Sequence, residues 1–318
     1  GHLLGHEEIL LETGDGRNQT VRKFLKGGIT PVHTLETEET DTTVVVKGMD
    51  FQHIYDKRTG TFSGMEYGGL ACLDRPMEIN IWRAPTDNDM YIRQEWKRAW
   101  YDQAYTRAYE TKVYRKEFSV EITSRMSLAA ASVQRMMDLE ATWVVDGNGG
   151  LQVNLQVRRN MEFPELPRFG LRLFLDQRLD QVTYYGMGPV ESYPDKHRAS
   201  WHGLFHAGAA ALHEDYIRPQ ENGSHADCDY VLLSDGRFCL AAASEQRFSF
   251  NASIYTQEEL EKKTHHYELE PSGSVVLCLD YAQNGIGSNS CGPKVLDRYR
   301  FDEETFTFCI KLVPFVKN

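Results

Sequence analysis

Four short polar segments hold most of the side chains in this sequence that could do chemistry. They are residues 82–89 (WRAPTDND), 185–195 (YGMGPVESYPD), 216–223 (YIRPQENG) and 284–293 (NGIGSNSCGP). Each combines glycine or proline, which allow sharp changes of chain direction, with amide, carboxylate or guanidinium groups that can bind polar ligands. Loops of this kind at the rim of a β-structure commonly bind other molecules, although solvated turns with local ion pairs have the same composition.

Two glutamates in these segments, Glu191 and Glu221, are candidates for glycoside hydrolysis. That reaction uses two carboxyl groups roughly 5 to 10 Å apart. The sequence does not place the two side chains relative to each other. Since most loop glutamates are solvated or bind backbone amides, a catalytic pair is the less favoured interpretation.

The histidines and cysteines do not complete a metal site or a nucleophilic site. His202 and His206 are four residues apart, but Gly203 and a strand-like context argue against a shared helical face. Cys291 follows a Gly-x-Gly turn, and a cysteine that lines a pocket is more usual than a nucleophile. We therefore expect no metal site and no catalytic cysteine in this chain.

The elements that must position these segments are mostly strands. Apolar residues alternate with polar ones over residues 151–157, 169–175, 248–254 and 306–312, which is the pattern of strands with one buried face. Residues 146–150 (DGNGG), 234–237 and 57–60 predict tight turns between strands. Helices are expected only over residues 91–105 and, after a capping box of Thr256 and Glu259, through about residue 264. The pattern predicts an all-β fold, a large antiparallel β-sandwich.

Composition excludes several classes of function. A net charge of −11 and a pI near 5.5 argue against a nucleic-acid partner. No apolar run reaches the roughly 18 residues of a membrane span, and no basic stretch precedes an apolar one, so we expect no secretory signal and no membrane partner. The six cysteines form no C-x-x-C pair, which is typical of reduced thiols in a cytoplasmic protein.

Taken together and in this order, the four segments resemble the C-terminal region, or small chain, of the large bacterial β-galactosidases of glycoside hydrolase family 2. Residues 83–89 resemble that family's R-A-P-x-D-N-D segment, and residues 185–195 its Y-G-x-G-P-x-E-x-Y-x-D segment. Residues 219–223 and 284–293 resemble its P-x-E-N-G turn and its G-I-G loop. The resemblance covers residues 42–318, and residues 1–30 resemble the last strand of a preceding immunoglobulin-like domain. We therefore expect a remnant and linker over 1–34 and the β-sandwich domain over 35–318.

The resemblance implies a galactose mutarotase-like supersandwich and the retaining hydrolysis of terminal β-D-galactosides. It also implies that the catalytic glutamates, with magnesium and sodium, belong to a TIM-barrel domain, so no catalytic residue and no cofactor is expected in this chain. Its expected partners are that barrel and the galactoside, and the intact enzyme could be a homo-oligomer. The resemblance assigns Asn289, Ser290 and Cys291 to a loop on the aglycone side of the active-site mouth, with Cys291 where the best-studied member of the family has a sugar-stacking tryptophan. The remaining loop or domain-interface candidates are Arg83, Asp87, Asn88, Asp89, Glu191, Glu221 and Asn222.

Two other functions remain open at this stage. An autonomous carbohydrate-binding module would use exposed aromatic rings, for which the candidates are Trp82, Tyr185, Tyr193 and Trp201. An aldose 1-epimerase would need a general acid and a general base. The candidates for that pair are His197, His202 or His225 with Glu191 or Glu221.

Overall fold

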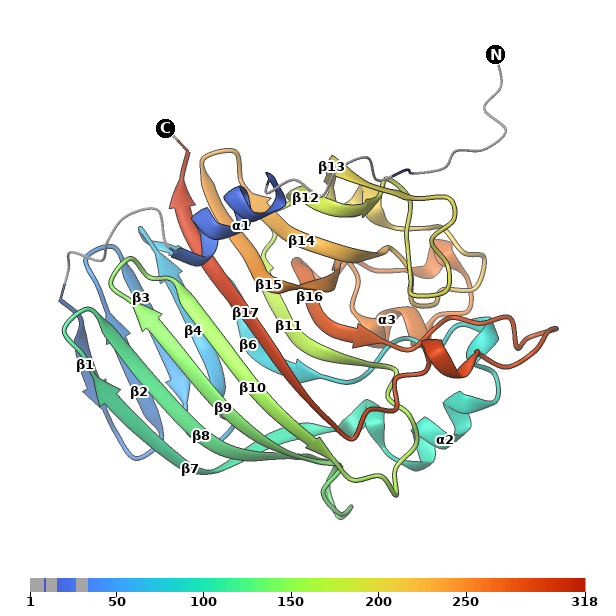
Figure 1. The fold of residues 1–318 in the computed structure, drawn as a ribbon, viewed down its shortest axis with the longest axis horizontal. Coiled ribbons are helices and arrows are strands. Elements are labelled where there is room, and N and C mark those ends of the chain that lie inside the picture. The colour runs from blue at the N-terminus through green and yellow to red at the C-terminus, as the bar shows by residue number, and fades with distance from the viewer. Residues whose placement is uncertain (1–8, 10–15, 27–33, 318) are drawn as a thin grey trace.

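The computed structural model describes residues 9, 16–26 and 34–317, and within them strands dominate (Figure 1). The strands are β1 (Glu36–Glu39), β2 (Thr43–Lys47), β3 (Phe51–Asp56), β4 (Thr61–Tyr67), β5 (Leu70–Ala71), β6 (Leu73–Asn80), β7 (Tyr105–Arg115), β8 (Ser119–Ala129), β9 (Met137–Asp146), β10 (Leu151–Arg159), β11 (Arg168–Asp176), β12 (Gln181–Gly188), β13 (Trp201–Gly208), β14 (Ser224–Ser234), β15 (Phe238–Ser253), β16 (Ser274–Gln283) and β17 (Thr305–Val316). The α-helices are α1 (Gly16–Lys26), α2 (Ile92–Arg98) and α3 (Gln257–Lys262).

These strands form two antiparallel sheets that pack as layers. Within the described residues, one sheet has five strands in the order β1-β2-β3-β4-β5, and the other has twelve, with β6, β11 and β16 joined beside its main path. Side chains alternate as predicted, since Leu151, Val153 and Leu155 of β10 are buried. Aromatic side chains join the layers, with the rings of Phe62 and Trp143 5.2 Å apart. The predicted large antiparallel β-sandwich is therefore confirmed.

The long strand β15 connects two parts of the twelve-stranded sheet. Its first half pairs with β17, from Phe238 to Ala243, and its second half pairs with β16, from Ser249 to Ser253. Strand β14 follows β15 on its other side. The four polar segments follow β6, β12 and β16 and precede β14, and the topology brings these strand ends together.

The predicted turns and one of the two predicted helices are confirmed. Tight turns join β3 to β4, β9 to β10 and β14 to β15, and helix α3 begins after Thr256, whose side chain accepts a hydrogen bond from the Glu259 amide. The predicted helix over residues 91–105 is wrong in its length. Helix α2 ends at Arg98, because Trp100 adopts a left-handed backbone with φ of 60° and a separate 3₁₀ turn follows. Trp96 is buried whereas Trp100, four residues further on, is 45% exposed, so the two tryptophans do not share one buried helix face.

The N-terminal segment packs on the sandwich where it is described. Helix α1 lies against β14, β15 and β17, where the ring of Phe24 is 5.5 Å from that of Tyr230. Residues 16–26 are therefore helical rather than part of a strand, whereas Gly5, His6 and Glu7 lie outside the described residues. The predicted boundary at residue 34 stays a prediction.

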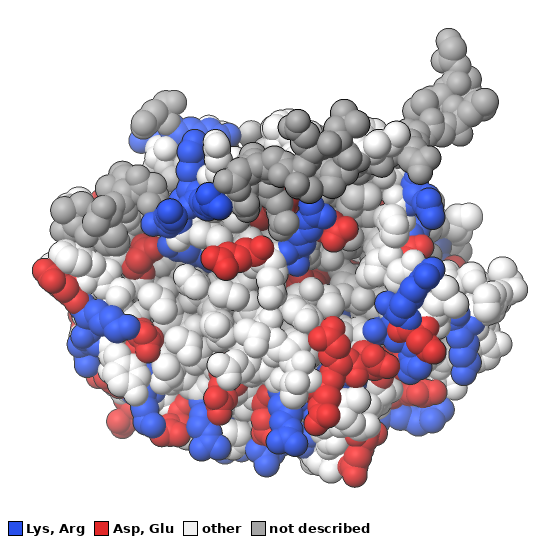
Figure 2. Space-filling model, viewed as in Figure 1, with Lys and Arg blue, Asp and Glu red and all other residues white. Residues whose placement is uncertain are grey.

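The surface carries charges of both signs. In Figure 2 basic and acidic side chains alternate along the lower rim of one face, and the centre of that face is largely uncharged. All six cysteines are free thiols, and four of them are buried. Among the described residues, no helix combines the length and the apolar character that a membrane span requires.

Candidate functional site

The four polar segments meet at one end of the sandwich and bind one another. The first and third segments exchange two hydrogen bonds, from the Glu221 amide to the Ala84 carbonyl at 2.9 Å and from the Ala84 amide to Glu221 Oε2 at 3.1 Å. The second and third are joined at 2.9 Å between the Gly223 amide and Glu191 Oε2. The first also binds the fourth, through the side chains of Arg83 and Asn88. The motifs therefore build one site rather than four separate loops.

A buried ion pair organises the first segment. Arg83 Nη2 lies 2.7 Å from Asp89 Oδ1, and the two side chains are 0% and 3% exposed. Asp89 Oδ2 also accepts hydrogen bonds from the amide and hydroxyl of Thr86, which shapes the 3₁₀ turn Asp87–Asp89. Arg83 donates further to the carbonyls of Asn284 and Gly285, at 2.8 and 3.1 Å. Because the pair has no access to solvent, removal of one partner would leave a charge unpaired inside the protein.

Two side chains fix the loop 284–293. Asn88 Nδ2 donates to the Gly287 carbonyl at 2.8 Å, and Asn88 Oδ1 accepts from Ser290 Oγ at 2.7 Å and from the Ser290 amide at 3.3 Å. From the opposite segment, the Asp195 carboxylate accepts from the amides of Ile286 and Gly287 at 2.8 and 2.7 Å. The loop is thereby clamped at its base from both sides.

Beyond this clamp the loop leaves the body of the molecule. The connection between β16 and β17, orange-red in Figure 1, projects from the end of the sandwich. Ser290 and Cys291 are exposed and Asn289 is half-buried. The three predicted loop residues are thus available to a partner or ligand.

Glu221 is held inside the protein by an arginine of strand β11. It forms an ion pair with Arg168, which also binds Asp280 through Nε at 3.0 Å and Nη2 at 2.5 Å. All three side chains are at most 2% exposed. Burial raises the pKa of the Glu221 and Asp280 carboxyls, because two carboxylates share one guanidinium away from water. Glu221 therefore joins loops to the core and has no free oxygen for catalysis.

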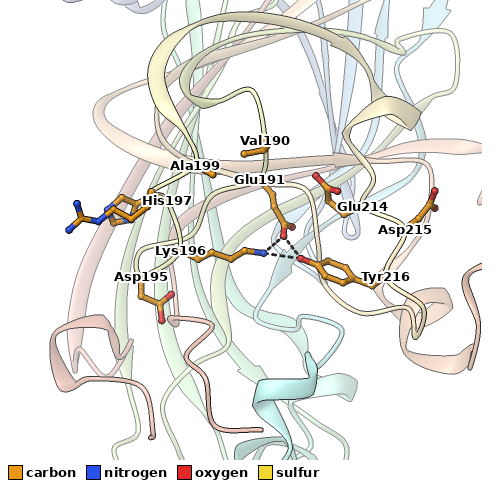
Figure 3. A pocket seen from close by; sticks show the side chains of 10 residues that line it. Val190, Glu191, Asp195, Lys196, His197, Ala199, Glu214, Asp215 and Tyr216 are labelled. Atoms are coloured by element: carbon orange, nitrogen blue, oxygen red, sulfur yellow. Dashed lines mark hydrogen bonds and ion pairs between the residues drawn. The ribbon is translucent and has the colours of Figure 1, made fainter. Parts of the chain in front are cut away.

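Glu191 is engaged in a similar way. Its carboxylate binds Lys196 and Tyr216 as well as the Gly223 amide, and the three side chains converge in Figure 3. Lys196 Nζ lies 2.8 Å from Tyr216 Oη. Burial and the neighbouring Glu191 carboxylate raise the pKa of Tyr216. Glu191 and Glu221 are both buried supports of the loops, and neither has the free, solvent-facing carboxyl of a hydrolytic pair.

Asn222 and Asp87 complete the predicted set. Asn222 Oδ1 accepts from the Glu214 amide at 3.0 Å, and its Nδ2 donates to the Gln220 carbonyl at 2.9 Å. Asp87 is exposed, and only its backbone amide is bound, to Gln220 Oε1 at 2.8 Å. Of the predicted loop or domain-interface residues, Arg83, Asp89, Glu191, Glu221 and Asn222 are buried within the chain, and their role at a domain interface stays a prediction. Asp87 and Asn88 remain accessible.

A cavity of about 600 Å³ opens between the second and third segments (Figure 3). Its lining includes Lys196, Tyr216, Glu214 and Asp215. Asp195, which clamps the loop 284–293, lines it too. The cavity and the projecting loop are therefore built on the same support.

The candidate residues for an epimerase and for a carbohydrate-binding module differ in their exposure. His225 is buried, with its Nδ1 bound at 3.0 Å to the Met187 carbonyl, and burial lowers its pKa to about 4. Trp82 and Tyr193 are also buried and offer no face to a sugar, whereas Trp201 is 40% exposed. Within residues 9, 16–26 and 34–317, no three His, Cys, Asp or Glu side chains gather in a way that could hold a metal ion.

Sequence reasoning missed the groups that bind the predicted ones. Arg168 and Asp280 stand in otherwise apolar strands, and a charged residue in such a strand is a signal of a buried ionic partner. Asp195 lay within a recognised segment, but its bonds to a loop some 90 residues away are not visible from sequence.

The chain matches known proteins over most of its length. The family described as "Beta galactosidase small chain" matches residues 47–312. A β-galactosidase of Actinobacillus pleuropneumoniae is 44% identical over 280 residues, which are 88% of this chain and 28% of that protein. One from Staphylococcus xylosus is 34% identical over 98% of this chain and 31% of that protein.

A solved structure is also similar. The galactose 1-epimerase of Lactobacillus acidophilus has a TM-score of 0.47 and 8% identity, covering 91% of this chain and 100% of the epimerase. The chain spans about three-tenths of the length of the curated relatives it matches. Because the family model matches residues 47–312, which are most of the chain, this chain belongs to the β-galactosidase small-chain family.

Proposed function

We propose that this chain is the C-terminal domain of a β-galactosidase that hydrolyses terminal β-D-galactosides with retention of configuration. In this proposal it completes the mouth of the active site and supplies no catalytic carboxylate. The observation that carries it is the clamp on the loop 284–293, which holds Asn289, Ser290 and Cys291 outward at the end of the sandwich.

The chemistry of the carboxyls supports the second part of the proposal. A retaining mechanism needs one free carboxylate as the nucleophile and one carboxyl as the acid/base. The Glu191 carboxylate is bound by Lys196, Tyr216 and the Gly223 amide. The Glu221 carboxylate is bound by Arg168 and the Ala84 amide. The nucleophile and the acid/base therefore belong to another part of the enzyme, and the TIM-barrel domain is the proposed partner.

The role of this chain's own residues is to position the loop 284–293 and to exclude water from the active site. Asn88 and Asp195 orient the loop, and the loop covers the leaving-group side of the bound galactoside. Cys291 gives the aglycone a smaller contact than an aromatic ring would, which favours small or polar aglycones. No described group of three ligands fits magnesium or sodium here, so these ions are proposed for the rest of the enzyme.

The proposal extends to the cellular compartment and the oligomeric state of the enzyme. Six free thiols support a reducing, cytoplasmic compartment. A homo-oligomer of the intact enzyme is compatible with this proposal.

The test is hydrolysis of nitrophenyl β-D-galactoside by this chain alone and after mixing with the separately expressed remainder of the enzyme. We expect no turnover from the chain alone and turnover on mixing. Turnover from the chain alone, abolished in Glu191→Gln or Glu221→Gln, would contradict the proposal.

A further inference from the structure

The cavity between the second and third segments has side chains that no internal contact uses. Of its acidic groups, Glu191 is bound by Lys196 and Asp195 by the amides of Ile286 and Gly287. The carboxylate of Glu214 makes no hydrogen bond or ion pair with any described residue, and neither does the guanidinium of Arg198. Asp215 has only a 3.7 Å contact with His213, and its side chain is 79% exposed. In Figure 3 Glu214 and Asp215 lie on the wall that Tyr216 continues.

Electrostatics limit what these groups can bind. Glu214, Asp215 and Arg198 together leave one net negative charge, so an anionic ligand is disfavoured. Burial and the nearby Glu191 carboxylate raise the pKa of Glu214. Such a rise is expected for a carboxyl that has no cation bonded to it. Hydroxyl groups suit this set, because they donate to carboxylates and accept from a guanidinium.

The remaining lining suits the carbon face of a sugar ring. Val190 is 41% exposed, and Ala199 and the ring of Tyr216 also line the cavity. The volume of about 600 Å³ falls within the range of roughly 300–1,000 Å³ that small-molecule sites occupy. The pocket thus combines a few apolar contacts with several polar groups, which is the usual composition of a small-molecule site.

We propose that this pocket binds a neutral pyranose unit of galactosides longer than a disaccharide. The inference rests on the proposed function and names a further part of the substrate. Asp195 provides the connection, since it lines the pocket and also clamps the loop that carries Cys291. A chain of sugar units that passes the loop would therefore meet Glu214 and Asp215.

The experiment measures kcat and KM of the intact enzyme for two substrates, nitrophenyl β-D-galactoside and the trisaccharide β-galactosyl-lactose. The variants are Glu214→Gln with Asp215→Asn, which keep the side-chain shapes, and separately Arg198→Ala. Glu117→Gln is the matched control, because Glu117 is an exposed carboxylate that does not line the pocket. Loss of charge-assisted hydrogen bonds should raise KM for the trisaccharide about tenfold with little change in kcat. Neither constant should change for the nitrophenyl substrate.

The two substrates separate the two proposals. An unchanged KM for the trisaccharide, or an equal loss on both substrates, overturns the pocket assignment while the proposed function stands. If the unmodified enzyme hydrolyses neither substrate, the proposed function fails and this inference fails with it.

Discussion

Asn88→Ala is the substitution that most directly loosens the loop 284–293. Asn88 is half-buried, and its amide makes three hydrogen bonds to the loop 284–293, at 2.8 Å to the Gly287 carbonyl and at 2.7 and 3.3 Å to Ser290. The substitution removes these bonds without disturbing the buried Arg83–Asp89 pair beside it. The remaining clamp is Asp195, which holds only Ile286 and Gly287.

The expected magnitude follows from these contacts. Hydrogen bonds contribute about 0.5–1.5 kcal/mol each to stability. Because the bond from the Ser290 amide is long and Asn88 is partly exposed, the three bonds together should stabilise the closed loop by about 2 kcal/mol. The outer part of the loop should then open about 30-fold more often, and the free energy of global unfolding should fall by up to about 2 kcal/mol, because the lost bonds are absent from both the open and the unfolded states. In the intact enzyme, looser closure should lower kcat/KM for nitrophenyl β-D-galactoside by about tenfold.

Hydrogen–deuterium exchange of the peptide covering residues 284–293 measures the opening directly. Asp87→Ala is the matched control, because Asp87 is the neighbouring residue, is exposed, and makes no side-chain contact among the described residues. Exchange should accelerate in Asn88→Ala and not in Asp87→Ala. Equal exchange in the unmodified protein and Asn88→Ala would refute the reasoning, because the loop would then be held by something other than this side chain.

Three further predictions follow from other parts of the site. Arg83→Met leaves Asp89 buried and unpaired, so urea unfolding should show a loss of about 3–5 kcal/mol, and a loss below about 1 kcal/mol would contradict the buried pair. Burial lowers the pKa of His225 to about 4, so the unfolded chain takes up a proton between about pH 6.5 and 4 that the folded chain does not. The contribution of this group to the free energy of unfolding is therefore present above pH 6.5 and lost on acidification. Between pH 7 and 4, the free energy of unfolding of His225→Phe should fall by roughly 3 kcal/mol less than that of the unmodified protein. In the intact enzyme Cys291→Trp should lower KM for aryl galactosides several-fold by adding a stacking surface, and an unchanged KM would remove Cys291 from the aglycone side.

The sequence allowed the strands to be predicted because each buries one face. The alternation of Leu151, Val153 and Leu155 needs no knowledge of the partner strand, and burial in the structure matches it. The helix after residue 91 was predicted too long, because the left-handed turn at Trp100 depends on local packing that periodicity does not report.

The candidate site was only partly predictable. The segments could be recognised one by one, yet their function as a clamp depends on contacts such as Arg83 with Asn284, 201 residues apart in the chain. Glu191 and Glu221 could be either catalytic or structural by composition. The structural role is decided by their ion pairs, Glu191 with Lys196 and Glu221 with Arg168, which are visible only in the folded chain.

The central claim is that this chain shapes the active site without carrying its nucleophile. Labelling the intact enzyme with a 2-deoxy-2-fluoro-β-galactoside traps the covalent intermediate of a retaining mechanism on the nucleophilic carboxylate, and peptide mass spectrometry locates it. We expect the label outside residues 1–318, with none on Glu191 or Glu221. A label on either glutamate would contradict it.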